Sequence, residues 1–288
     1  RHIHPALLES YAQIGRSLSS KTGIIGQTTG FPSLDRKLSG LQGSQMIVIA
    51  GRPGMGKTSF ALDIVRHAAV QNQVPCAVFS LEMSSAQLAS RLMCAVAKVD
   101  MQSIRISTQA TGEALEKLLP AMEVIGQSPI YIDDSPGITV TELLAKARKL
   151  KIEHGLGLIM IDYLQLMNTG GRTENRQLEI SELTRSIKIA ARELDVPILL
   201  LSQLSRASER RGNDKTPILS DLRESGSIEQ DADVVLFLHR DNYYDETADN
   251  TSKIIIAKQR MGPTGTIKAS RIGSQTRFVE LETNRQET

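Results

Sequence analysis

One stretch of sequence decides the fold of this chain, Met46-Ile47-Val48-Ile49-Ala50-Gly51-Arg52-Pro53-Gly54-Met55-Gly56-Lys57-Thr58. An apolar, strand-like run leads into a glycine-rich segment, residues 51–58, that matches the pattern G-x-x-x-x-G-K-[S/T]. The glycines let the backbone turn tightly and bring its N–H groups close to phosphate oxygens, and the following helix presents its positive N-terminal end to the same anion. Lys57 can reach the β- and γ-phosphates, and the Thr58 hydroxyl can hold Mg²⁺. A chance glycine turn is disfavoured by the flanks, so the stretch predicts binding and hydrolysis of a nucleoside triphosphate.

Length and composition limit what the rest of the chain can be. Its 288 residues allow one large domain or two small ones, and 40% hydrophobic with 23% charged residues is ordinary for a soluble globular protein. A net charge of +2 gives no overall field for nucleic acid, so such a site must be local or formed by several chains together. Cys76 and Cys94 cannot form a disulfide framework, and no signal peptide or membrane-spanning run is visible, which predicts a cytoplasmic protein without a membrane partner.

Apolar strand-like runs alternate with helical patterns from residue 26 onward. This alternation predicts a doubly wound, mostly parallel α/β sheet whose two faces are covered by helices. Capping boxes at Ser84 with Gln87 and at Thr139 with Glu142 indicate two helix starts. The predicted strands are residues 46–50, 76–81, 130–132, 158–161, 198–202, 234–239 and 253–258. The predicted helices are residues 57–71, 84–97, 112–125, 140–153 and 177–194.

Ligands of such sheets bind at the carboxyl ends of the strands, so the residues just after each predicted strand are site candidates. Asp162 is expected to bind Mg²⁺, directly or through water, unless it merely caps the next turn. Glu82 can orient or deprotonate the attacking water, although glutamate is most often a solvated surface residue. Gln203 is a candidate sensor, because its amide can hydrogen-bond the γ-phosphate and report the nucleotide state to a moving loop.

Three further polar or basic segments are candidates for phosphate contacts. Residues 221–227 have the composition of a flexible loop, in which Arg223 and the backbone near Gly226 hold phosphates of a nucleic acid, or of an ordinary surface loop. Residues 206–215 have the composition of a mobile basic loop or of a solvated surface. Lys258 and Arg260 follow the last predicted strand. If they reach a γ-phosphate they stabilise transition-state charge, which for an arginine is worth roughly 10³–10⁵ in rate.

Residues 1–25 are predicted to form a helix and tether, separate from the domain at residues 26–288. The helix either lies on its own domain or docks on a neighbouring subunit, and its place outside the domain favours the second reading. The polar stretch that begins at Ser19 ends the helical pattern. Four apolar residues at three- and four-residue spacing form its stripe: Leu7, Tyr11, Ile14 and Leu18.

Six blocks of the sequence together resemble the DnaB family of bacterial replicative DNA helicases. The resemblance covers the family's linker helix and its C-terminal RecA-like ATPase domain, which is essentially the whole chain. It is specific, because the blocks occur in the family's order and spacing. The blocks are GRPGMGKT (51–58), SLEM (80–83), LIMIDYLQLM (158–167), ILLLSQLSR (198–206), SDLRESGSIEQDADVV (220–235) and IIIAKQRMGPTGT (254–266).

The resemblance implies a RecA-like fold and a role for each residue of the ATP site. Lys57 and Thr58 bind phosphate and Mg²⁺ by similarity, and ATP lies between adjacent subunits. Asp162 is the implied Walker B acid, Glu82 the catalytic carboxylate and Gln203 the sensor of the γ-phosphate.

The resemblance also implies residues that act between chains or on DNA. Arg260 is the implied arginine finger for the neighbour's ATP, with Lys258 beside it. The loop formed by Arg223, Glu224, Ser225 and Gly226 is implied to line a central channel and grip the DNA backbone.

Partners follow from the same resemblance. Proteins of this family form hexameric rings around single-stranded DNA, and the N-terminal helix docks on the adjacent subunit. The family's N-terminal domain, which helps to assemble the ring and to receive primase, has no counterpart in these residues, so primase and helicase loader are expected to act through regions missing here. Because each subunit adds only a few phosphate contacts, DNA binding is expected to weaken steeply with salt.

The working hypothesis is that ATP hydrolysis at subunit interfaces drives stepwise movement along one DNA strand and displaces the other. Two alternatives remain open. One is a RecA- or RadA-like strand-exchange ATPase on the same core fold. The other is a non-catalytic, ATP-gated assembly module, against which the presence of both Glu82 and Asp162 argues.

Overall fold

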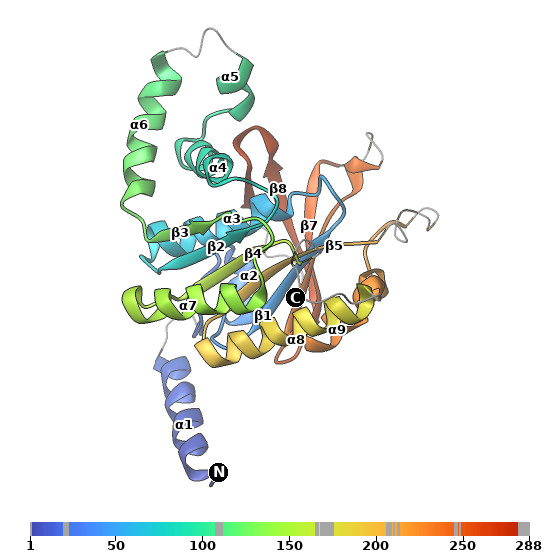
Figure 1. Cartoon of the computed structure of the whole chain (residues 1–288). Coiled ribbons are helices and arrows are strands. Elements are labelled where there is room, and N and C mark those ends of the chain that lie inside the picture. Colours follow the sequence, from blue (N-terminus) through green and yellow to red (C-terminus); the bar gives the residue numbers. More distant parts are fainter. Residues whose placement is uncertain are drawn as a thin grey trace.

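The structure is a computed structural model of the chain and describes residues 2–19, 23–106, 112–164, 167, 176–205, 209, 211, 214–244, 247 and 249–281. Within these residues a single sheet of 9 strands crosses the molecule in the order β3-β2-β4-β5-β1-β6-β7-β8-β9 (Figure 1). The strands are β1 (Met46–Gly51), β2 (Cys76–Ser80), β3 (Ile130–Asp133), β4 (Leu158–Asp162), β5 (Ile198–Gln203), β6 (Val234–Arg240), β7 (Thr251–Gln259), β8 (Gly265–Ile272) and β9 (Arg277–Glu280). The α-helices are α1 (His4–Ser19), α2 (Pro32–Leu38), α3 (Lys57–Arg66), α4 (Ser85–Ala97), α5 (Met101–Ile106), α6 (Gly112–Gly126), α7 (Val140–His154), α8 (Arg176–Leu194) and α9 (Gly226–Asp231).

The half of the sheet from β3 to β6 is parallel throughout. β1 lies between β5 and β6, with Gly51 opposite Gln203 and Ala50 opposite Phe237. Every residue of β1, β2 and β4 is buried, as expected for strands covered by helices on both faces. The predicted doubly wound, mostly parallel sheet is therefore confirmed, and its carboxyl edge gathers the ends of β1, β2, β4 and β5.

The other half, from β6 to β9, is antiparallel. β7 returns along β6 with Val234 opposite Gln259 and Arg240 opposite Ser252. The carboxyl end of β7 thus lies beside the start of β6, at the sheet edge opposite to residues 51–58. The strand predicted at 253–258 exists, but the assumption that its end faces the same site as the other strand ends was wrong. β8 and β9 were not predicted from the sequence.

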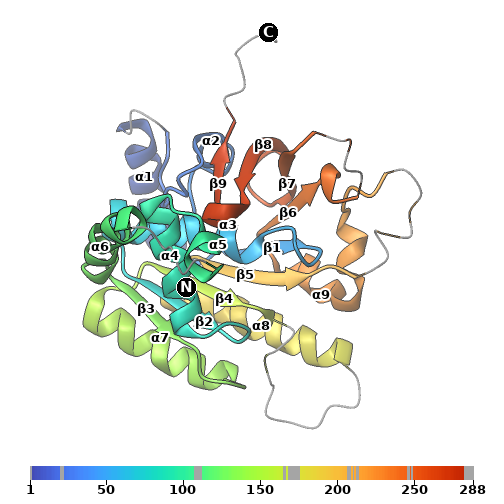
Figure 2. The ribbon, with the colours of Figure 1, turned by 90° about the horizontal axis from the view of Figure 1, so that it is seen from above.

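Two hydrophobic layers hold the helices on the sheet. α2, α3 and α4 cover one face, where Phe60 packs between Phe31 (ring centroids 4.9 Å apart) and Phe278 (5.6 Å). α7, α8 and α9 cover the other face, where Leu183 and Ile187 are fully buried. Figure 2 shows α7 and α8 side by side along one face of the sheet, with α3 on the opposite side. Both layers are almost entirely aliphatic, in line with the 3% aromatic content.

Helix predictions are largely confirmed, with small differences at the ends. The helix predicted at 57–71 is α3 continued by a π-helical turn, His67–Gln71. Both capping boxes are present, since Ser84 and Thr139 accept from the backbone N–H three residues on. The short helices α2, α5 and α9 were not predicted. No helix in the described parts of the chain is long and apolar enough to cross a membrane.

α1 stands away from the domain, below the sheet in Figure 1. Leu7 is 55% exposed, Tyr11 78% and Leu18 84%, so the apolar stripe of this helix covers no surface of its own chain. The reading in which the helix lies on its own domain is therefore wrong for this conformation. The division of the chain at residue 26 stays a prediction.

The segment predicted as a polar loop at 221–227 is helical instead. A 3-10 helix, Leu219–Ser225, runs directly into α9. Asp221 and Leu222 are each only 3% exposed, and Asp221 accepts the Ile218 N–H (2.8 Å) and pairs with Arg211. The local hydrogen bonds of a buried aspartate thus order a stretch whose composition had indicated flexibility. Of the basic residues predicted at 206–215, Arg206 and Arg210 lie outside the described residues.

Candidate functional site

The loop between β1 and α3 adopts a conformation that its glycines make possible. Gly54 and Gly56 have φ angles of 81° and 94°, in the left-handed region that other residues rarely adopt. A Cβ on Gly56 would lie 2.9 Å from Cζ of Phe278 and 3.0 Å from Nε of Arg271. The loop therefore needs glycine both for its turn and for close packing.

Lys57 is the first residue of α3, directly after this loop, and its ammonium is turned toward the carboxyl edge of the sheet. Its Nζ donates to the carbonyl oxygen of Gly51 (3.0 Å). Burial lowers the pKa of Lys57, and attraction to Asp162 and Glu82 opposes that effect. Burial disfavours the Lys57 ammonium, and a phosphate anion bound beside it would favour its protonated form.

Asp162 closes β4 directly beneath the loop. The Oδ2 atom of Asp162 accepts a hydrogen bond from the Thr58 hydroxyl at 2.8 Å, and Asp162 is only 1% exposed. Burial raises the pKa of Asp162 to about 6, with the neighbouring Glu82 adding to the rise and Thr58 and Lys57 opposing it. The reading of Asp162 as a simple cap of the next turn does not account for this buried contact with the glycine-rich loop.

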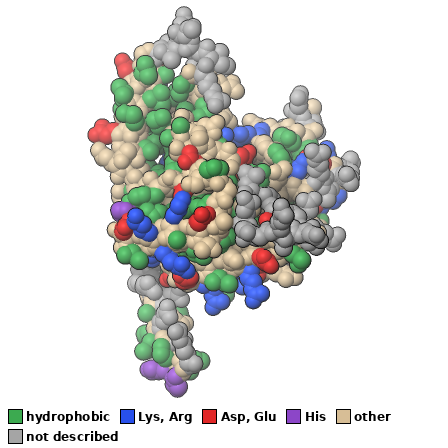
Figure 3. All heavy atoms as spheres, viewed as in Figure 1, with side chains coloured by type: hydrophobic (Ala, Val, Ile, Leu, Met, Phe, Trp, Pro, Cys, Tyr) green, Lys and Arg blue, Asp and Glu red, His purple; other side chains and the backbone are tan. Residues whose placement is uncertain are grey.

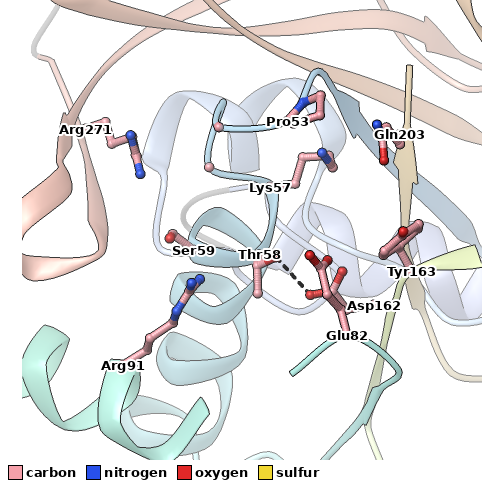
Figure 4. A pocket seen from close by; sticks show the side chains of 12 residues that line it. Pro53, Lys57, Thr58, Ser59, Glu82, Arg91, Asp162, Tyr163, Gln203 and Arg271 are labelled. Carbon is pink, nitrogen blue, oxygen red and sulfur yellow. Dashed lines mark hydrogen bonds between the residues drawn. The ribbon is translucent and has the colours of Figure 1, made fainter. Parts of the chain in front are cut away.

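Glu82 and Gln203 complete the carboxyl edge. Ser80 of β2 pairs with Asp162, which brings Glu82, two residues further on, beside the Asp162 carboxylate (Figure 4). Gln203 pairs with Gly51 and points toward Lys57 from the end of β5. Lys57, Thr58, Glu82, Asp162 and Gln203 thus lie together, as the positions of the strand ends predicted, and their chemical roles stay predictions.

A cavity of about 220 Å³ opens between these groups. Two arginines that sequence reasoning missed face it from the far side: Arg91 on α4 and Arg271 on β8 (Figure 4). Burial lowers the pKa of Arg271, followed by repulsion from Arg240 and Arg91, and its buried Nε has no hydrogen-bond partner in the structure. Cations that crowd one another around a polar cavity indicate a site for a multiply charged anion. The lining residues are Pro53, Gly54, Gly56, Lys57, Thr58, Ser59, Glu82, Arg91, Asp162, Tyr163, Gln203 and Arg271.

The missed residues differ in how far the sequence could have revealed them. Arg91 lies on α4 between the buried Leu88 and Leu92, so a cation next to the inward face of a predicted helix was a readable signal. Arg271 had none, because the strand that carries it was not predicted. Ser59 and Tyr163 each follow a residue that had been singled out.

The oxygen atoms at Thr58 and Asp162 fit a divalent cation such as Mg²⁺. A hydroxyl and a carboxylate are hard oxygen ligands, and Mg²⁺ in phosphate-binding sites commonly takes one or two protein oxygens and completes its shell with phosphate and water. The buried carboxylate with its raised pKa is a position where a cation would favour the ionised form. No cluster of three or more His, Cys, Asp or Glu side chains suited to a metal occurs among the residues that the structure describes.

Lys258 and Arg260 do not join this cavity. The Arg260 backbone N–H donates to the carbonyl oxygen of Asp233 (3.0 Å), just before β6 begins. Lys57 and Arg260 are therefore separated by the length of a strand, roughly 17 Å for five residues. Within one chain neither cation can touch a phosphate held by Lys57.

The backbone of residues 223–226 spans the junction between the 3-10 helix and α9. The structure does not describe the side chains of Arg223 and Glu224, which were predicted to contact DNA, or the environment of Gly226. Their contacts with DNA stay a prediction.

Known proteins that resemble this chain include replicative DNA helicases. The sequence model of the DnaB-like helicase C terminal domain matches residues 26–280. Over 285 residues the chain is 48% identical to the replicative DNA helicase DnaC of Bacillus subtilis (strain 168), covering 98% of this chain and 62% of that protein. It is 46% identical over 276 residues to the replicative DNA helicase DnaB of Pasteurella multocida (strain Pm70), covering 93% of this chain and 59% of the relative. The chain thus spans about three fifths of the length of these relatives.

Two solved structures share the fold over nearly the whole chain. The ATPase domain of G40P superposes with a TM-score of 0.92 at 39% identity, covering 98% of this chain and 99% of that one. A DnaB-like replicative helicase, described with its interactions with primase, superposes with a TM-score of 0.89 at 39% identity, covering 98% of this chain and 67% of that one.

Proposed function

The chain belongs to the family of DnaB-like helicase C-terminal domains, and from that membership we propose that it is the ATP-driven motor domain of a replicative DNA helicase. It hydrolyses ATP at interfaces between subunits, moves along single-stranded DNA and unwinds the duplex at the replication fork. The observation that carries this proposal is a split site. The phosphate-binding loop and its acids lie at one edge of the sheet, whereas Lys258 and Arg260 lie at the other.

The chemistry proposed for the cavity uses the groups that already face it. Lys57 and the backbone N–H groups of residues 51–58 hold the phosphates, and Arg91 and Arg271 add positive charge from the other wall. Glu82 accepts the proton of the attacking water. The neighbouring Asp162 does not take this role, because its carboxylate accepts the hydrogen bond from Thr58. Thr58 and Asp162 would hold Mg²⁺, which would supply neutralisation of the phosphate charge. Gln203 hydrogen-bonds the γ-phosphate and distinguishes ATP from ADP.

Two exposed apolar surfaces support assembly of several copies. One is the stripe of α1, and the other lies on α6, where Leu115 is 56% exposed, Leu119 61% and Met122 56%. Figure 3 shows apolar side chains gathered over the α6 region at the upper left and along α1 at the bottom. Contiguous exposed apolar surface marks an interaction site in a soluble protein. In the proposed assembly, α1 of one chain packs on the exposed apolar face of α6 in a neighbouring chain, as expected in a homo-oligomeric, hexameric ring.

The proposed partners of this chain, DNA among them, follow from its family membership. Single-stranded DNA passes beside the backbone at residues 223–226, which α9 connects to the region of Arg260. A backbone-gripping segment suits a motor that must move over any sequence. Primase and a helicase loader are partners of the longer helicase, and the bacterial cytoplasm is its compartment.

Mixing two inactive variants tests the shared site. Lys57→Ala chains cannot hold ATP but keep Arg260, and Arg260→Ala chains hold ATP but lack the finger. Each is expected to be inactive alone, whereas in an equal mixture about one interface in four combines an intact loop with an intact finger. Recovery of DNA-stimulated ATP hydrolysis on mixing supports the proposal, and absence of recovery contradicts it.

A second assay separates unwinding from other uses of the same fold. The unmodified chain is given ATP with a forked duplex and, in parallel, with homologous strands for exchange. Strand exchange without unwinding indicates a recombinase-like activity instead. ATP binding with negligible DNA-stimulated turnover indicates an assembly module.

A further inference from the structure

Lys258 and Arg260 rest on the C-terminal end of α9. Lys258 Nζ donates to the carbonyl oxygens of Glu229 (2.5 Å) and Ala232 (2.8 Å). Arg260 Nη2 donates to the carbonyl oxygen of Gln230 (2.7 Å). The last carbonyl groups of a helix lack partners within the helix and carry partial negative charge, so they attract cations. The helix end therefore forms a seat, made of these three carbonyl groups, that holds both cations.

One carboxylate, Asp233, lies next to this seat and connects it to the sheet. Its Oδ1 is 3.5 Å from Arg260 Nη1. Its Oδ2 accepts from the Met46 backbone N–H (2.8 Å) and from Lys188 Nζ (2.6 Å). Met46 is the first residue of β1, the strand that ends in the phosphate-binding loop of the same chain. Asp233 is thus fixed to the sheet through one oxygen and faces Arg260 with the other.

The exposures of the two partners differ in a way that suits positioning. The Asp233 side chain is 12% exposed, whereas the Arg260 side chain is 48% exposed. The carboxylate is largely buried and held by two hydrogen bonds, whereas the guanidinium keeps an open side toward solvent. An arginine has five N–H donors, so contacts to Asp233 and Gln230 leave donors for a third partner.

We propose that Asp233 is a positioning residue for Arg260, which it aims, from the seat at the end of α9, at the γ-phosphate bound by a second copy of this chain. The inference rests on the proposed function and adds a residue to it. Arg260 has a long side chain with many rotamers, and an unheld finger would lose entropy when it meets the transition state. Asp233 limits those rotamers in advance, so less freedom is lost during the reaction.

A purely structural role for Asp233 is the competing explanation, since Oδ2 joins β1 to α8. That role predicts loss of stability without any link to the finger. Positioning predicts a loss of turnover that belongs to the chain donating Arg260. The two explanations therefore differ in which chain of an interface must carry Asp233.

The first measurement is steady-state ATP hydrolysis by the full chain with Asp233→Asn. An amide has one acceptor oxygen and cannot serve Arg260 on one side and Met46 with Lys188 on the other. We expect kcat to fall about 10- to 100-fold, since a misplacement near 1 Å costs about that much, with KM for ATP changed by less than about threefold. Glu193→Gln, which removes a carboxylate bonded to Arg148 at 2.6 and 2.9 Å far from the site, is the matched control and should leave both constants unchanged.

The second measurement places the substitution on one chain of a mixed interface. Asp233→Asn is combined with Lys57→Ala on the finger donor, or with Arg260→Ala on the chain that holds ATP. The inference predicts that recovery of activity on mixing falls at least tenfold in the first arrangement and by less than twofold in the second. If Asp233→Asn does not fold, Asp233→Glu replaces it, because the added methylene displaces the carboxylate while keeping its charge.

Each outcome decides the question. Equal recovery in the two arrangements, or equal loss in both, overturns the positioning role while the shared site stands, because the parent mixture of Lys57→Ala and Arg260→Ala remains active. Absence of recovery in the parent mixture overturns the proposed function and this inference together.

Discussion

Gly56→Ala is the sharpest single test of how the phosphate-binding loop is built. Gly56 precedes α3 with a φ of 94°, and a Cβ there would lie 2.9 Å from Cζ of Phe278. Phe278 is only 3% exposed and belongs to β9, whose backbone N–H at this residue donates to the buried Asp63 of α3 (2.6 Å). Neither the ring nor the strand is therefore free to move away from the added methyl group.

Two costs add up in this variant. A non-glycine residue held in a sparsely populated backbone region costs about 1–3 kcal/mol. Inserting a methyl group into a packed contact costs about 1–3 kcal/mol more. We expect the free energy of unfolding to fall by roughly 2–6 kcal/mol, the larger value applying if the Phe278 ring does not shift at all. Because the same Cβ would lie 3.0 Å from Nε of Arg271, ATP affinity is also expected to fall about tenfold or more, the equivalent of losing one hydrogen bond to a charged group.

Urea denaturation and titration with a fluorescent ATP analogue measure the two effects. Gly126→Ala is the control, because nothing lies within 4 Å of its Cβ position at the end of α6 and its φ is not positive. That control should be neutral or stabilising by up to about 1 kcal/mol. If Gly56→Ala unfolds at the same urea concentration as the parent chain and binds ATP equally well, the strain and packing argument is refuted.

Three further predictions follow from the site and the surface. Arg271→Ala should weaken ATP binding about tenfold or more by equilibrium titration, because its unpaired, buried Nε faces the cavity, and an unchanged affinity would remove it from the site. For Asp162, the folded pKa of about 6 lies above the unfolded value of 3.8, so between these values the folded chain binds more protons and its stability falls as pH rises. In urea denaturation at pH 4 to 7 without nucleotide, Asp162→Asn should lack this part of the fall, which amounts to up to about 3 kcal/mol. Identical pH profiles of the variant and the parent chain would contradict this prediction. Leu119→Lys on the exposed stripe of α6 should reduce nucleotide-dependent assembly in sedimentation velocity without lowering the melting temperature, whereas an unchanged oligomer would show that α6 is not the docking face.

The sequence revealed the carboxyl edge of the sheet because its strands are continuous aliphatic runs. In a parallel sheet such strands end at one edge, so reading the residue after each run was sufficient to bring Glu82, Asp162 and Gln203 to Lys57. Only the direction of the strands was needed for this prediction. β7 ends at the opposite edge because antiparallel pairing reverses that direction, and nothing in an apolar run states which way it is paired.

The C-terminal strands and their arginine escaped prediction for a related reason. β8 alternates buried Ile267 and Ala269 with exposed Lys268, a strand pattern that a search for continuous aliphatic runs passes over. The strand pairs with β7 and β9 at the antiparallel side of the sheet. Asp233 was likewise invisible, since its role depends on contacts with Met46, Lys188 and Arg260, which only the fold brings together.

The reversed direction of β7 determines what kind of assembly can complete the site. The glycine-rich loop and Arg260 lie at opposite edges of one sheet, so a single chain cannot bring its own Arg260 to a nucleotide held by its own loop. In an interface where one copy's loop edge meets the next copy's finger edge, different surfaces face each other, and the contact is heterologous. Such contacts repeat from copy to copy and generate either a closed ring or an open helical filament, but not a two-fold dimer. A dimer with two-fold symmetry would pair like edges, with two loops and no finger or two fingers and no loop. If Arg260 is the finger proposed above, an active assembly of this chain is built head to tail. Ring closure is then set by the rotation between neighbours, which the proposed contact between α1 and the exposed face of α6 would determine.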